Sequence, residues 1–196
     1  MSLAADSDPF ELPLFPLQTV LFPGGPLALR IFEPRYLDMI ANCLRTGRSF
    51  GVIAIRRGTE VGPAETFDVG TTAEIVDWHR EAGGLLGVAA VGRRRFRLAS
   101  KQRRADGLYV GSAVWLEHAR SGPLPERFAA LAKLLREVAS VTAEHVPDDD
   151  AEWVGLRLAE ALPLPIPVKQ SLLEIEQPVE RLERLTAILY AARRAE

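Results

Sequence analysis

Short runs of apolar residues, separated by proline and glycine, fill the first 120 positions of the chain. Runs of this length predict β-strands when they alternate with polar residues and are bounded by turn formers. Proline cannot donate a hydrogen bond to a neighbouring strand, so the opening runs 12–17 and 20–26 are expected to be edge or bulged strand pieces. The further predicted strands are residues 27–32, 50–55, 69–78, 85–91, 94–99 and 108–116, with a loop at 56–67.

One helix interrupts these strands. Pro34 suits its first turn, where the missing N–H has no partner to lose. Apolar residues then recur at helical spacing, and Gly47 is a suitable C-terminal stop. The residues of that apolar face are Tyr36, Leu37, Ile40, Cys43 and Leu44. Six or more short strands with one inserted helix predict a rolled, barrel-like sheet.

The pattern becomes helical after Ser121-Gly122-Pro123. An apolar stripe from Phe128 to Val141 predicts one helix, and further helices are expected at 151–162, at 168–174 and from Pro178 onward. Pro163, Pro165 and Pro167 predict an extended connector, since proline breaks a helix interior. The sequence therefore predicts an α+β protein with a disordered tail (1–9), a β-rich pseudo-barrel subdomain (10–120) and a helical subdomain (121–196).

Composition and charge narrow the class of protein. The chain has 196 residues, is 47% hydrophobic and 26% charged, and carries a net charge of −2. These values are typical of a globular protein and give no strong overall attraction to nucleic acid or membrane. One cysteine, Cys43, indicates a reducing compartment, and neither a signal peptide nor an 18-residue apolar run is visible. We therefore expect a cytoplasmic protein with no membrane association.

Several segments together resemble the N-terminal domain of the Lon protease family, over about residues 10–192. The Phe-Glu-Pro-Arg-Tyr pentapeptide is specific where it closely follows a proline-rich opening, as it does here. The segments that carry the resemblance are Pro-Leu-Phe-Pro-Leu (13–17), Val-Leu-Phe-Pro-Gly (20–24), Ile-Phe-Glu-Pro-Arg-Tyr (31–36), Gly-Arg-Arg-Arg-Phe-Arg-Leu (92–98), Leu-Pro-Leu (162–164) and Lys-Gln-Ser-Leu-Leu-Glu (169–174).

This resemblance implies a PUA-like β pseudo-barrel followed by a helical subdomain. In Lon such a domain helps to capture unfolded substrate proteins, and related domains serve as docking modules in eukaryotic ubiquitin-ligase receptors. Full Lon continues into an ATPase motor and a Ser-Lys peptidase domain, whereas this chain ends at Glu196. We therefore expect a non-catalytic, protein-binding or peptide-binding module, an adaptor or regulator linked to protein quality control.

Motifs for phosphate or metal chemistry are not apparent. The nearest approach to a phosphate loop is Gly-Val-Ala-Ala-Val-Gly-Arg-Arg at 87–94, which lacks the lysine and the hydroxyl residue and falls within strands. His79, His118 and His145 lie far apart in the sequence and do not form a zinc-binding motif. We expect no cofactor and no metal.

Nucleophiles are equally hard to nominate. Cys43 falls on the apolar face of the inserted helix, where free cysteine acts as a small hydrophobe. Lys169 and Ser171 are two residues apart on a helix, so their side chains do not face each other. The run Asp148-Asp149-Asp150 lacks the spacing of a calcium loop and places negative charge ahead of the next helix. The sequence thus predicts that the chain is not an enzyme.

Aromatic residues provide the candidate peptide-binding surface. Alternation places Trp78 on an outward face, and Tyr109 and Trp115 on one face of the last strand. Phe32 and Tyr36 belong to the pentapeptide and complete the set. The partner would be unfolded polypeptide or a specific protein. The alternative is that the pentapeptide is a structural corner, with Phe32 and Tyr36 in the core and its Glu and Arg paired.

A second candidate ligand is RNA. Seven basic residues lie between Arg93 and Arg104 with no acid among them. If 94–99 is a strand, Arg95 and Arg97 face outward with Arg93 just ahead, and Arg103 and Arg104 extend the patch. The stacking platform of aromatic residues that is typical of single-strand binders is missing there. A solvated outer face is the alternative.

Overall fold

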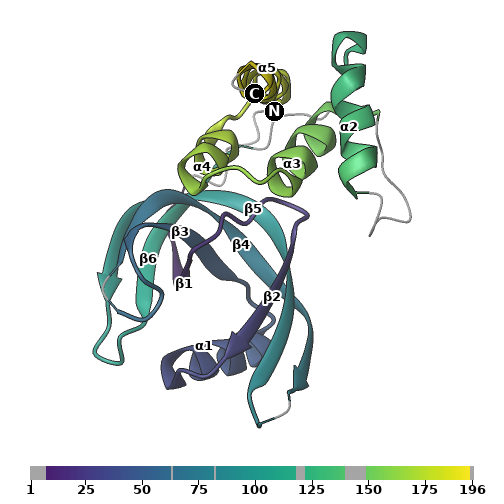
Figure 1. Ribbon diagram of the computed structural model, residues 1–196. Coiled ribbons are helices and arrows are strands. Elements are labelled where there is room, and N and C mark those ends of the chain that lie inside the picture. Colours follow the sequence, from purple (N-terminus) through teal and green to yellow (C-terminus); the bar gives the residue numbers. More distant parts are fainter. Residues whose placement is uncertain (1–7, 63, 82, 118–121, 140–148, 195–196) are drawn as a thin grey trace, which may run out of the picture. The chain divides into compact units, whose positions relative to one another are not determined.

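The computed structural model describes residues 8–62, 64–81, 83–117, 122–139 and 149–194. The chain divides into two compact units, Met1–Leu116 and Glu117–Glu196 (Figure 1). The boundary predicted between residues 120 and 121 lies outside the described residues, as does most of the tail predicted for 1–9.

The first unit consists of a six-stranded sheet and one helix. In chain order its elements are β1 (Phe10–Leu17), β2 (Pro26–Ile31), α1 (Pro34–Thr46), β3 (Phe50–Gly58), β4 (Ala64–Arg80), β5 (Leu86–Arg103) and β6 (Tyr109–Trp115). The strand order is β2-β5-β4-β3-β1-β6, with β1 and β3 parallel and the other pairs antiparallel.

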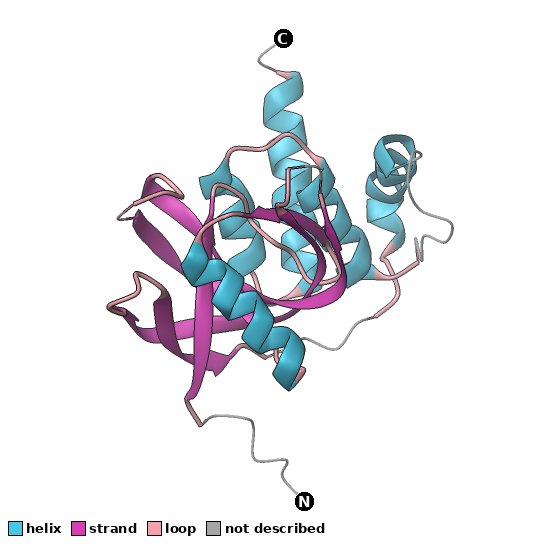
Figure 2. Ribbon diagram, turned by 90° about the horizontal axis from the view of Figure 1, so that it is seen from below, coloured by secondary structure: helices cyan, strands magenta, loops and turns pink. Residues whose placement is uncertain are grey.

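β6 also pairs with the C-terminal half of β5, so the sheet curls back toward its own edge. The α+β class and the rolled pseudo-barrel with an inserted helix are therefore as predicted, although the sheet is not a closed barrel. α1 lies across the mouth of the rolled sheet in both views (Figures 1 and 2).

β4 and β5 are longer than predicted, and a bulge interrupts the pairing between them. Thr71 lies opposite Arg95 but Ala73 lies opposite Gly92, so β5 carries one extra residue between these pairs. The Thr72 hydroxyl occupies this site, accepting a hydrogen bond from the Arg94 N–H at 3.1 Å. A bulge of this kind resets the alternation of the strand. Beyond the bulge, Arg95 and Arg97 lie on the face of β5 opposite to Phe96, as predicted. Arg95 is nevertheless only 3% exposed, so the solvent exposure predicted for it is wrong.

α1 buries its apolar face against the face of the sheet that carries Phe15, Phe50 and Val52. Pro34 occupies its first turn, and Gly47 ends it in the left-handed conformation at φ 65°. The Tyr36 ring stacks on the Phe15 ring with centroids 4.0 Å apart. The same core cluster contains Met39, Ile40, Cys43, Phe50, Val52, Val88 and Val110.

A second, smaller core surrounds Phe96, which is fully buried. A Cβ added to Gly51 would lie 2.8 Å from the Phe96 Cζ, and one added to Gly70 would lie 2.7 Å from it. At Gly70 the same Cβ would lie 2.3 Å from the carbonyl oxygen of Val52. Neighbouring strands thus have glycine where the Phe96 ring needs the space.

The second unit is helical. Its elements are η1 (Glu126–Phe128), α2 (Ala129–Ala139), α3 (Ala151–Ala161), α4 (Ile166–Glu174) and α5 (Pro178–Arg193). The Asp150 carboxylate caps α3 by accepting the Trp153 N–H at 2.7 Å, which agrees with the role predicted for that acidic run. Pro167 lies in the first turn of α4 rather than in the connector, because proline is well tolerated there.

Arg181 ties the end of α4 to α5. Its side chain is fully buried, and its Nε donates to the carbonyl of Leu172 at 3.0 Å. Its Nη2 donates to the carbonyl of Ile175. Carbonyls at the end of a helix have no partner within the helix, so Arg181 provides the donors that these two need.

We expect Gly70→Ala to lower the free energy of unfolding by about 2–3 kcal/mol, because the added methyl group meets a backbone carbonyl that cannot move aside. Gly122→Ala is the control, since nothing lies within 4 Å of a Cβ placed there. Urea unfolding of the two variants would check this. An unchanged midpoint for Gly70→Ala would show that the sheet relaxes around the methyl group.

We expect Arg181→Met to destabilise the protein by about 2–4 kcal/mol, because two carbonyls lose their charged donor while the apolar part of the side chain is kept. Arg184→Met, on the exposed side of α5, should change stability by less than about 0.5 kcal/mol. Thermal unfolding, monitored by circular dichroism, would compare the stabilities of the two variants. Equal effects would mean that the carbonyls find other donors.

Candidate functional site

A cleft of about 560 Å³ runs along β2 in the first unit. One side is the strand itself, including Leu27 and Leu29. The other side comes from the end of β1 and from Val61 in the β3–β4 turn. Phe32, directly after β2, is 60% exposed, and Val61 is 66% exposed. Large apolar side chains are therefore open to solvent beside an apolar depression, a feature typical of binding sites.

The polar residues of the cleft are mostly paired. Glu81 forms an ion pair with Arg30 at 2.9 Å, and His79 Nε2 lies 3.8 Å from the same carboxylate. Glu60 accepts a hydrogen bond from the backbone N–H of Gln18 at 2.7 Å. The polar groups therefore surround a lining that is largely apolar.

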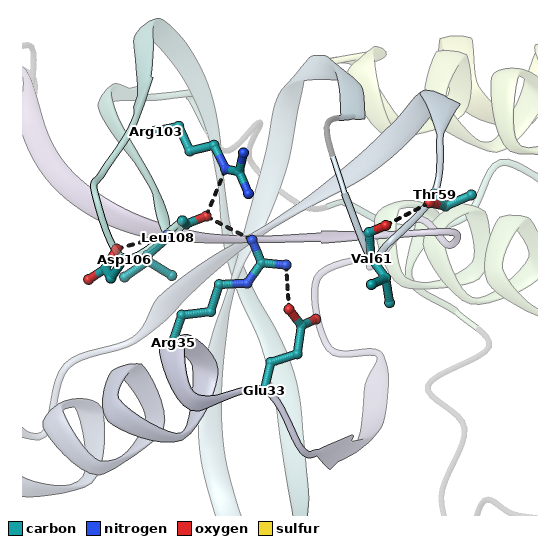
Figure 3. Close-up of polar contacts among 8 residues, drawn as sticks. Glu33, Arg35, Thr59, Val61, Arg103, Asp106 and Leu108 are labelled. Atoms are coloured by element: carbon teal, nitrogen blue, oxygen red, sulfur yellow. Dashed lines mark hydrogen bonds and ion pairs between the residues drawn. The ribbon is translucent and has the colours of Figure 1, made fainter.

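The pentapeptide forms a fixed corner beside the cleft (Figure 3). Arg35 pairs with Glu33 at 2.7 Å and donates from Nη1 to the carbonyl of Gly107 at 2.8 Å. Arg103 Nε donates to the same carbonyl at 3.3 Å. Because the Arg35 side chain is buried, these contacts attach the start of α1 to the β5–β6 turn. The predicted pairing of Glu33 with Arg35 is confirmed, whereas the placement of Phe32 in the core is wrong.

Tyr36 is among the residues that line the cleft, but its side chain is almost completely buried. It is 3% exposed, and burial, opposed by the charge of Arg35, raises the pKa of its hydroxyl to about 12. Its ring is held in the core against Phe15, and the peptide contact predicted for Tyr36 stays a prediction.

The other predicted aromatic residues lie apart from this cleft. Trp78 is 57% exposed and lies opposite Val88 on β5, but it is not part of the cleft lining. Trp115 is half-buried, stacks on Phe10 at 4.1 Å, and lines a different cleft of about 790 Å³. Tyr109 is half-buried below Lys101, whose Nζ lies 5.5 Å from its ring centroid. The five predicted residues thus do not form one site.

The basic residues proposed for RNA mostly have local contacts. Arg93 pairs with Glu74 at 2.7 Å, and Arg104 pairs with Asp106 at 3.3 Å. The Arg94 guanidinium lies 4.2 Å from the ring centroid of Trp115. Arg97 is exposed. With Arg95 buried and Arg103 directed to Gly107, the predicted patch is smaller than the sequence suggested.

Candidate chemical groups are engaged in structural roles. Burial raises the pKa of the Cys43 thiol, which favours the unreactive protonated form. Lys169 donates to the carbonyl of Glu160 at 2.6 Å, whereas the Ser171 hydroxyl donates to the carbonyl of Val168 at 2.8 Å, so the two do not form a dyad. His118, His145 and Asp148 lie outside the described residues. No helix in the described part of the chain is long and apolar enough to cross a membrane.

Sequence reasoning missed Leu27, Leu29 and Val61 as members of the site. The sequence pattern predicts only a strand at Leu27 and Leu29 and only a loop at 56–67. A signal for Val61 exists, because it is a lone large apolar residue within a polar turn. Its position beside β2 depends on the fold, not on the local pattern.

Residues 11–191 match the family described as the ATP-dependent protease La (LON) substrate-binding domain. The crystal structure of a Lon N-terminal domain protein from Xanthomonas campestris is 40% identical and has a TM-score of 0.79, covering 91% of this chain and 98% of that chain. The N-terminal domain of Mycobacterium avium complex Lon protease is 19% identical with a TM-score of 0.58, covering 89% of this chain and 95% of that chain, and this likeness shows the fold alone.

Longer proteins contain similar segments. Protein cereblon from Gallus gallus is 28% identical in an alignment of 139 positions that covers 69% of this chain and 28% of that protein. Lon protease from Anaeromyxobacter dehalogenans is 26% identical in an alignment of 196 positions that covers 92% of this chain and 23% of that protein. The chain thus spans about a quarter of the length of these relatives. Since the family match extends over nearly all of its length, the chain belongs to the LON substrate-binding domain family.

Proposed function

We propose that this chain is a non-catalytic module that recognises polypeptide, either unfolded segments or a specific partner protein, as a cytoplasmic adaptor or regulator linked to protein quality control. The observation that carries the proposal is the open apolar cleft along β2, with Phe32 and Val61 exposed beside it. Family membership adds weight, because the family is described as a substrate-binding domain.

The energetics suit modest, reversible binding. Fully burying a phenylalanine or valine side chain contributes about 1.5–3 kcal/mol. A few such contacts in one cleft are consistent with micromolar affinity, roughly −8 kcal/mol. Affinity in this range would allow capture and release without an energy source within this chain.

Other ligand classes have less support. Reaction chemistry would need a nucleophile with a base, and Cys43, Lys169 and Ser171 are all held in structural contacts. RNA would need free cations, and Arg93, Arg94 and Arg104 each already contact a carboxylate or an aromatic ring. Apolar polypeptide is the ligand that the cleft fits best.

We expect the double change Phe32→Ser and Val61→Ser to weaken binding of a labelled, permanently unfolded polypeptide by about ten-fold, because two apolar contacts are lost. Leu44→Ser with Val76→Ser is the matched control. These residues are 41% and 53% exposed and lie outside the cleft. Fluorescence anisotropy would compare the variants, and equal weakening in both would place the binding surface elsewhere.

Binding to this polypeptide should change less than about two-fold between low and high salt, since apolar contacts dominate. RNA held by about five phosphates would instead show a slope near −3.5 in log affinity against log salt. Anisotropy at several salt concentrations, with RNA as competitor, distinguishes the two. A steep slope with effective competition would favour RNA over polypeptide.

A further inference from the structure

β2 is an edge strand whose free side faces the cleft. Among the described residues it pairs with β5 alone, through the register Pro26 opposite Val91 to Ile31 opposite Leu86. The whole stretch from Leu27 to Phe32 lines the cleft. The cleft is therefore a groove that runs parallel to an open strand edge.

The hydrogen-bond pattern identifies which backbone groups face this groove. The Gly92 N–H donates to the Gly25 carbonyl at 2.9 Å, so these two residues occupy a hydrogen-bonded position of the β2–β5 pairing. Bonded and non-bonded positions alternate in antiparallel strands. Leu27, Leu29 and Ile31 therefore bond to β5, and the backbone groups of Ala28 and Arg30 point away from it. The backbone groups of Pro26 also point away from β5, so its missing N–H does not remove a hydrogen bond to that strand.

The outward groups are accessible. Ala28 and Arg30 are both exposed. No turn, loop or side chain in the described part of the chain hydrogen-bonds to the backbone of either residue. The small side chain of Ala28 leaves room for close approach of another backbone. Each of these residues thus offers a free N–H and a free carbonyl on the side of the groove.

We infer that the cleft binds its polypeptide in extended form, as a strand added to the free edge of β2. This inference rests on the proposed function and specifies the class of ligand: a segment that is apolar at alternate residues and flanked by basic residues. Donors and acceptors that alternate at the spacing of a strand are complementary to an extended polypeptide backbone. The half-buried Leu27 and Leu29 provide the apolar face for every second side chain.

The carboxylates of the cleft support basic residues at the ends of the bound segment. Of the three carboxylates in the cleft, Glu33 is paired with Arg35 and Glu81 with Arg30. Glu60 accepts only a backbone N–H and has no cationic partner in the described residues. A lysine or arginine at one end of the bound segment would provide that partner.

The test uses the unmodified protein and three capped, fluorescent peptides in which valine and serine alternate between terminal lysines. One peptide is unmethylated, one carries N-methyl groups on its valines, and one carries them on its serines. In an added strand every second N–H points to β2, so only one methylated series blocks the bonds. The valine side chains are expected on the same face as Leu27 and Leu29. In antiparallel addition the serine N–H groups then point to β2, so methylated serines abolish binding. In parallel addition the valine N–H groups point to β2, so methylated valines abolish it.

We expect one methylated peptide to bind like the unmethylated peptide and the other to bind at least about ten-fold more weakly, since several hydrogen bonds are lost together. Equal binding of the two methylated peptides, strong or weak, would overturn strand addition while leaving apolar capture in place. If neither the unmethylated peptide nor the permanently unfolded polypeptide binds, the proposed function itself is overturned.

Glu60→Gln tests the basic flank and keeps the acceptor for the Gln18 N–H. It should weaken the lysine-flanked peptide by about three-fold, the scale of one exposed ion pair, and leave a serine-flanked peptide unchanged. Equal effects on both peptides would show that Glu60 acts on the shape of the turn and not by charge.

Discussion

The first unit depends on the close approach of Phe96 to the strands around it. Opposite faces of β1 and β3 line two cores, and the Phe96 ring belongs to the smaller one. The ring fits because Gly51 and Gly70 have no side chain in its path. Five of the strands can therefore curl around a compact core, and β2, which pairs only with β5 in the described structure, remains at the outer edge. The exposed edge and the tight core are two results of the same geometry.

The pentapeptide that marks the family fixes the backbone at the end of the cleft and holds one aromatic side chain, Phe32, exposed beside it. Arg35 is buried between Glu33 and the Gly107 carbonyl, so it fixes the turn that follows β2. Tyr36 secures the next residue by stacking on Phe15. With both neighbours anchored, Phe32 is held outward at the end of the groove. A family motif can thus shape a binding surface through side chains that are themselves buried, here Arg35 and Tyr36.

The elements of this fold follow closely from local patterns. Pro34 and Gly47 delimit α1, Asp150 caps α3, and alternation identifies most strands. Long-range geometry limits the prediction elsewhere. The bulge at Arg94 depends on the Thr72 hydroxyl of a neighbouring strand, so it has no signal in its own segment. The cleft likewise combines Leu29 with Val61, which lie far apart in the sequence and meet only after the sheet has curled.

An open strand edge can also pair with the same edge of a second copy of the chain, and Pro26 weakens this pairing. Two β2 strands that paired antiparallel about Ala28 would place each Pro26 opposite the Arg30 of the other copy. Proline has no N–H to donate there, so such a homodimer would lack one hydrogen bond at each end of a short pairing. A foreign strand with an ordinary residue opposite Arg30 would lack only the single bond at Pro26. The proline at the start of β2 therefore disfavours self-association and leaves the edge free for heterologous partners.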